Sequence, residues 1–309
     1  MNQSKFTLAD VLTLIAGLAF GFICFLGSNF YTLGNIPQSI ILWVIIFVLM
    51  VGTALGAKWL KRASRNFKTC FVWEMILLVL FTGITIFFSY TPFPHFFVVS
   101  EQRPEIKSKL IASITQAEDM FVAYERYAEN RIGLYNKKLV NVAAAKSRYP
   151  SEYAAYGFEK NSVSDATQIE NKMFAVRADL FPTNYEEMKQ VASDWLTNER
   201  KKLSNWSWFR HNIGIVSAAN DVEKKSENWL NSLIELSLIR EKGEDARNFS
   251  YNLTFDDVKI HFLKSGKPNW PSIGFATLTY LLMLLSWFVT KVDFRRKGAL
   301  TTAPYEVVL

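Results

Sequence analysis

The chain has 309 residues, of which 50% are hydrophobic and 20% are charged, and its formal net charge is +7. This balance excludes disordered, collagenous and disulfide-scaffold proteins. Residues 91–271 hold 25 basic and 24 acidic residues, so most of the net positive charge comes from short runs elsewhere. A nearly neutral large domain argues against nucleic-acid binding.

Four apolar segments are long enough to cross a membrane as helices. No Asp, Glu, Lys or Arg lies between Asp10 and Lys58, which is typical of two successive spans. The four transmembrane helices are predicted at residues 11–27, 37–57, 69–90 and 273–290. A signal peptide is the alternative for the first span, but no small-x-small cleavage site follows it.

Lys and Arg in the short connections predict the direction of the spans. The connection 28–36 is uncharged, whereas the loop 58–68 and the tail 291–309 are basic. We therefore expect an inner (plasma) membrane protein whose termini, including residues 1–10, face the cytoplasm. Residues 91–271 then form an extracytoplasmic, periplasmic domain. This segment has no cysteine, since the two cysteines of the chain, Cys24 and Cys70, fall in or beside apolar segments. A eukaryotic extracellular domain of this size would more often carry disulfides, so a bacterial periplasmic domain is favoured.

Two features inside the spans have alternative interpretations. Pairs of glycines four residues apart allow close helix packing, either between subunits of an oligomer or within the first hairpin, which we favour. Glu74 is an intramembrane carboxylate, which can mark an ion path. It lies near the basic cytoplasmic end, where Arg65 or Lys68 could neutralise it, and we favour this interfacial role. The glycine pairs are Gly17 with Gly21 and Gly52 with Gly56.

The domain between the third and fourth spans is predicted to be a helical bundle or coiled coil. Thr91–His95 contains two prolines and should interrupt the third helix, and Phe96–Val99 is either interfacial or a short strand. A helix from Pro104 to about Tyr149 carries an apolar seam with alternating steps of three and four residues. Its members are Ile106, Leu110, Ile114, Ala117, Phe121, Tyr124, Ala128, Ile132, Tyr135, Leu139 and Val142.

Further helices are expected at residues 164–180, 183–204 and 217–242, while residues 254–263 could form a helix or a strand. Trp206, Trp208 and Phe209 are candidates either for partner binding or for the helical core, and Trp229 is expected in that core. The end of the tail, with Tyr305, Val307 and Leu309, is suited to adding a strand to a partner's sheet. A disordered terminus is an equal alternative.

No catalytic, metal-binding or cofactor-binding pattern is present, so we expect neither an enzyme nor a cofactor. The fold class is therefore an all-α membrane protein with four transmembrane helices and an inserted extracytoplasmic domain. Its expected partners are the lipid bilayer, other envelope proteins and possible further copies of the chain. The favoured function is a scaffold or anchor in a secretion, motility or defence assembly of the cell envelope. A ligand-binding sensor and a channel or transporter subunit are the alternatives.

Overall fold

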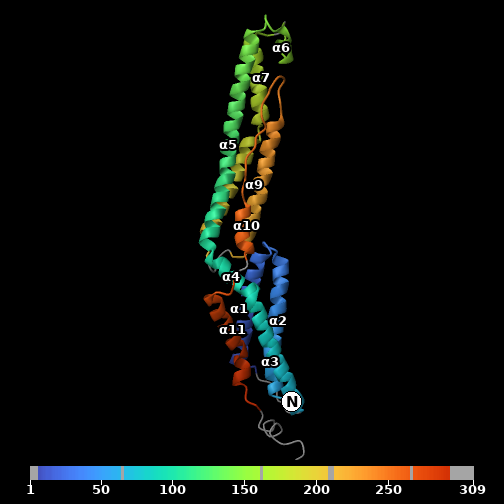
Figure 1. Ribbon diagram of the computed structural model, residues 1–309, viewed down its shortest axis with the longest axis vertical. Helices are drawn as coiled ribbons and strands as arrows, with labels where there is room; N and C mark the ends of the chain where they lie inside the picture. The colour runs from blue at the N-terminus through green and yellow to red at the C-terminus, as the bar shows by residue number, and fades with distance from the viewer. Residues whose placement is uncertain (1–5, 64–65, 161–162, 208–211, 265–266, 293–309) are drawn as a thin grey trace, which may run out of the picture. The chain divides into compact units, whose positions relative to one another are not determined.

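The computed structural model describes residues 6–63, 66–160, 163–207, 212–264 and 267–292, and within these ranges it is helical without strands (Figure 1). The chain divides into two compact units. The first, called the membrane unit, consists of residues 1–104, 212–217 and 259–309. The second, called the polar unit, consists of residues 105–211 and 218–258.

Four helices of the membrane unit are long and apolar enough to span a membrane, and they coincide with the four predicted spans. Most of them begin or end a few residues beyond the predicted boundaries, because helical hydrogen bonding continues past the apolar stretch. They are α1 (Leu8–Tyr31), α2 (Ile36–Lys61), α3 (Phe67–Tyr90) and α11 (Trp270–Val289).

The turn between α1 and α2 is short and locally fixed. Gly34 has φ +91°, a left-handed conformation that favours glycine. Asn35 caps α2, because its side-chain oxygen accepts a hydrogen bond from the backbone N–H of Gln38 at 3.2 Å. The uncharged connection is therefore a tight hairpin that holds α1 and α2 antiparallel.

The interruption predicted after the third span is a brief one. Helix α3 ends at Tyr90 and α4 (Pro92–Glu101) follows at once, since prolines are tolerated in the first turn of a helix. Phe93 of α4 stacks on Phe20 of α1, with ring centroids 4.6 Å apart. Phe96–Val99 is thus helical, and residues 92–104 pack with the membrane unit instead of starting the polar domain.

The polar unit is organised around α5 (Arg103–Ala144), a helix of 42 residues. At about 1.5 Å per residue, its length is about 60 Å. All eleven residues of the predicted seam are buried. The helix ends earlier than the expected Tyr149, and α6 (Pro150–Ala155) follows after a turn.

Two helices in tandem run antiparallel to α5. They are α7 (Asp165–Leu180) and α8 (Tyr185–Ser204), which match their predicted ranges closely. The Tyr124 hydroxyl donates to the carbonyl of Leu180 at 2.8 Å. Further along, Arg200 pairs with Glu118 at 2.5 Å. These contacts place successive turns of α5 against α7 and then α8, side by side as Figure 1 shows.

The third layer is α9 (Gly214–Leu238). It runs parallel to α5, because Trp229 packs against Phe121 and Ser237, further along α9, binds Arg131, further along α5. Trp229 lies 6.2 Å from Phe121 and 5.9 Å from Trp195, measured between ring centroids, so it packs in the core as expected. Helix α9 ends four residues before the predicted Lys242, because residues 239–255 leave the helix and return along α5. The sequence predicts either a helix or a strand at residues 254–263, and the structure has helix α10 there (Asp256–Leu263).

Candidate functional site

A buried ion pair joins three helices of the membrane unit. Asp10 lies in the first turn of α1 and Lys58 in the last turn of α2, so the antiparallel hairpin brings them to the same level. Their side chains form a salt bridge, and each is only 3% exposed. Ser286 of α11 donates to the same carboxylate at 2.5 Å. Both charges are therefore neutralised inside the bundle.

Glu74 adds α3 to these buried polar contacts, which are together called the polar cluster of the membrane unit. It is buried on α3 and accepts a hydrogen bond of 2.8 Å from the indole N–H of Trp287 on α11. Lys61 of α2 donates to the Trp287 carbonyl at 2.7 Å, and its ammonium lies 4.1 Å from the centre of the indole ring. Lys68, one of the two cations expected to neutralise Glu74, is exposed, and Arg65 lies outside the described residues.

The four candidate glycines do not share one surface. Gly17 and Gly21 face α2, where an added Cβ would contact Val51 and Trp43 respectively. Gly56 faces Leu77 of α3, and Gly52 has no neighbour within 4 Å. The α1 pair thus contributes to packing within the chain, whereas Gly52 is open.

The aromatic candidates are only partly described. Trp206 is 4% exposed. Its side chain is thus buried, which fits the alternative in which it fills the helical core. Trp208, Phe209, Tyr305, Val307 and Leu309 lie outside the described residues.

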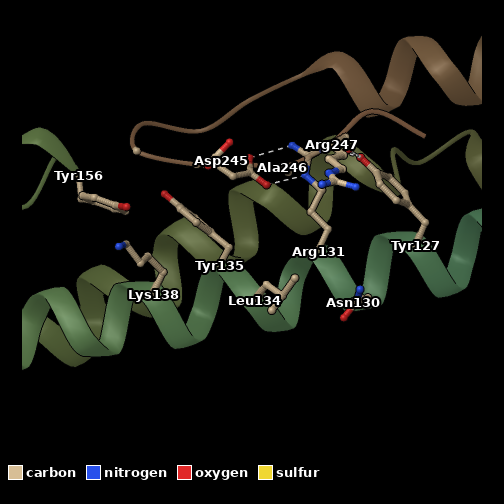
Figure 2. A pocket seen from close by; sticks show the side chains of 12 residues that line it. Tyr127, Asn130, Arg131, Leu134, Tyr135, Lys138, Tyr156, Asp245, Ala246 and Arg247 are labelled. Atoms are coloured by element: carbon tan, nitrogen blue, oxygen red, sulfur yellow. Dashed lines mark hydrogen bonds and ion pairs between the residues drawn. The ribbon is translucent and has the colours of Figure 1, made fainter. Parts of the chain in front are cut away.

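A pocket of about 620 Å³ opens beside α5 in the polar unit (Figure 2). One wall is α5 between Tyr127 and Lys138, and the other is the non-helical segment 243–247. Tyr156 closes one end. It packs on Gly243, whose φ is +75° and where a Cβ would lie 2.6 Å from the ring. The volume lies within the range of about 300–1,000 Å³ typical of ligand sites.

Arg131 forms the floor of this pocket. It is 5% exposed, and Glu244 accepts two hydrogen bonds from it, at 2.5 and 2.8 Å. Its other donors bind the Tyr127 hydroxyl at 3.3 Å, the Ser237 carbonyl at 2.9 Å and the Ile239 carbonyl. The five N–H groups of the guanidinium are therefore all engaged, which fixes the start of segment 239–255 to α5.

Burial and nearby charges shift the pKa values of the titratable groups at this floor. Burial alone would favour the neutral acid of Glu244, but hydrogen bonds from Arg131 and the Glu241 N–H outweigh it and lower the pKa of the carboxyl. Burial, with the nearby charges of Glu241 and Glu244, raises the pKa of Tyr135 to about 12. At neutral pH the floor is thus an ion pair beside a neutral phenol.

The sequence interpretation identified neither ion pair, although it contained a signal for one of them. Counting three residues on from Ala128 leads to Arg131, and four more lead to Tyr135, so Arg131 occupies a regular seam position. A charged residue in an otherwise apolar seam signals a buried, paired cation. Its partner Glu244 lies 113 residues further along the chain and carries no local pattern.

Within the described residues, no group of three or more His, Cys, Asp or Glu side chains could hold a metal ion. Comparison with known protein families, with curated proteins and with solved structures finds no match. The polar cluster of the membrane unit and the pocket of the polar unit are therefore the features that bear on function.

Proposed function

We propose that the protein is a membrane scaffold or anchor subunit of a multiprotein assembly in the cell envelope. The observation that carries this proposal is the polar cluster of the membrane unit, in which Asp10, Lys58 and Glu74 bind groups of neighbouring helices. Removing one partner of a buried ion pair is strongly destabilising, so such contacts hold neighbouring helices in one arrangement. This supports an anchor more than a channel or transporter, whose polar groups would line a water-filled path.

The proposed topology places both termini in the cytoplasm of a cell with an inner membrane, and the polar unit outside it. The basic loop 58–68 supports this direction. A core built around the 42-residue α5 supports a structural role, because a long packed helix offers an extended surface to partner proteins. The cytoplasmic partners would be met by the basic loop and by the tail from residue 291.

The topology is tested with single cysteines in a chain carrying Cys24→Ala and Cys70→Ser. We expect Arg62→Cys to be protected from a membrane-impermeant thiol reagent in intact cells, while Lys137→Cys reacts. Both side chains are exposed in the structure, so a difference reports sidedness. Labelling of Arg62→Cys in intact cells would reverse the orientation.

The scaffold role is tested by purification in a mild detergent followed by mass spectrometry of the proteins that accompany the chain. We expect a reproducible set of envelope proteins. Deletion of residues 299–309 should leave insertion unchanged and remove the cytoplasmic members of that set. Recovery of the chain alone would reject the proposal.

The second candidate function is a sensor that binds a ligand outside the membrane and signals through another protein. The specific observation in its favour is the pocket of about 620 Å³ beside α5. A thermal-shift screen of the full chain against small molecules would detect such a ligand, since a ligand that binds the folded state alone raises the unfolding temperature.

A further inference from the structure

The pocket beside α5 is elongated. Its α5 wall runs from Tyr127 to Lys138, eleven residues along the helix, which correspond to about 16 Å at about 1.5 Å per residue. An extended peptide rises about 3.3 Å per residue, so about five residues of extended chain match this length. The pocket therefore suits a short linear segment better than a compact molecule.

The two ends of the pocket carry cations. Figure 2 places Lys138 beside Tyr156 at one end and Arg247 beside Tyr127 at the other. The Lys138 ammonium lies 6.0 Å from the centre of the Tyr156 ring. Its ion pair with Glu152 is 3.6 Å long, and both side chains are more than 40% exposed. Such exposed pairs contribute little and exchange readily, so Lys138 can take another anion.

The ion pair at the floor contributes no net charge to the pocket. Arg131 and Glu244 neutralise each other, and the guanidinium has no donor left for a ligand. Asp245 offsets one of the two end cations. The lining as a whole therefore carries a net charge of +1, with its positive groups separated at the two ends.

One apolar side chain lies between the two ends of the pocket. Leu134 lies on α5 between Arg131 and Lys138 and is 59% exposed, although the seam residues on either side of it are buried. A single exposed leucine is ordinary on a protein surface. Here it lines a pocket whose two ends carry Lys138 and Arg247, and an apolar group of a ligand would cover it.

We propose that this pocket binds an extended acidic peptide segment of a partner protein. The segment has carboxylates at its first and fifth positions and an apolar side chain at the third. Alternate side chains of an extended chain lie on the same face, so these three groups can meet Lys138, Leu134 and Arg247 together. The inference rests on the proposed scaffold function in taking a protein as the partner.

The test uses ligand-detected NMR with the full-length protein in detergent. The probe is acetyl-Glu-Ser-Leu-Ser-Glu-amide, and its comparison is acetyl-Lys-Ser-Leu-Ser-Lys-amide. We expect the acidic peptide to bind at least about tenfold more tightly than the basic one, a difference of about 1.4 kcal/mol. Combining Lys138→Ala with Arg247→Ala should remove this preference.

The matched control combines Lys137→Ala with Arg126→Ala, an exposed lysine and an exposed arginine of α5 that do not line the pocket. It should bind the acidic peptide within about twofold of the unchanged protein, well below the tenfold step of about 1.4 kcal/mol. Equal binding of the two peptides, or an equal loss in the control, would overturn the proposal.

Glucuronate serves as the probe for an acidic sugar. If glucuronate binding depends on Lys138 and Arg247 while the acidic peptide does not bind, the ligand class is wrong. The scaffold function fails separately, because it predicts co-purifying proteins whatever the peptide does. Partners recovered without peptide binding would reject only the inference about the pocket.

Discussion

The two units each bury an ion pair, and the surroundings of the two pairs differ. Asp10 and Lys58 lie at the ends of two neighbouring helices, and a third helix contributes Ser286 to the pair. Arg131 and Glu244 instead connect the middle of a helix to a segment without secondary structure. The first pair therefore contributes to packing between helices of the membrane unit, where its side chains are only 3% exposed to solvent, whereas the second shapes the floor of a pocket.

The units also differ in how their helices approach one another. In the membrane unit a Cβ added to Gly27 of α1 would collide with the backbone carbonyl of Pro92. In the polar unit the core is filled by large side chains such as Tyr124, Tyr153 and Tyr185. Aromatic side chains fill the membrane unit as well, where Phe20, Phe30 and Phe93 are fully buried, so the close backbone contact at Gly27 is what sets it apart.

The largest effect is expected at the membrane pair. Lys58→Ala leaves the buried Asp10 carboxylate without its cation, and removing one partner of a buried pair costs about 3–5 kcal/mol. The measurement is denaturant unfolding of the full chain in detergent. Arg62→Ala, at an exposed position just beyond α2, is the control and should change little.

The same unfolding experiment can separate the contribution of the two charges from that of side-chain packing at these positions. Replacing both Asp10 and Lys58 by leucine removes both charges together, and such replacements are often neutral. We expect the double variant to be more stable than Lys58→Ala. If Lys58→Ala and Arg62→Ala unfold alike, the pair does not stabilise the membrane unit.

The next largest effect is expected at the ion pair of the polar unit. Arg131→Met should lower the free energy of unfolding by about 3 kcal/mol, again measured by denaturant unfolding, because Glu244 is left buried without its partner. Arg131→Lys should lose most of this stability as well, since lysine keeps the charge but cannot make the forked contact. Arg126→Met is the matched control on the exposed side of α5. Full stability of Arg131→Lys would mean that charge alone, and not the five hydrogen bonds, fixes segment 239–255.

A smaller effect is expected from the glycine contacts of the membrane unit. Gly27→Ala should destabilise the full chain by about 1–3 kcal/mol, the usual cost of overpacking. Gly52→Ala meets open space and should be neutral or stabilising by up to about 1 kcal/mol, the difference in helix propensity. Thermal unfolding in detergent distinguishes these opposite signs, and equal signs would contradict the close approach of α1 and α4.

The smallest effect is a pH dependence confined to the polar unit. Tyr135 has a folded-state pKa of about 12, above the ordinary value of about 10. Its contribution to stability is thus complete below about pH 10 and is lost as the pH rises towards 12. Tyr135→Phe should reduce the loss of stability over this range, as measured by unfolding at each pH. Unchanged slopes would show that Tyr135 does not titrate with unfolding.

The sequence predicted most helices because long periodic patterns depend on local spacing. The seam of α5 is one example, and the uncharged stretch between Asp10 and Lys58 is another. It missed the contacts that depend on distant partners. Charges at the ends of spans are normally explained by lipid head groups and topology, so Asp10 and Lys58 looked ordinary until the hairpin brought them together. The pocket needed the return of residues 239–255 along α5, which no local pattern specifies.

The contact between Ser286 and Asp10 has a consequence for biosynthesis. These residues are 276 positions apart, and the Thr13 hydroxyl similarly donates to the carbonyl of Met283 at 3.0 Å. Ribosomes add about 5–20 residues per second, so α1 and α2 exist for many seconds before α11 emerges. During that interval the Asp10–Lys58 pair can form, but the face of α1 that α11 covers stays open. A nascent chain truncated before α11 would thus expose this face to membrane chaperones and proteases, which could recognise it as incomplete.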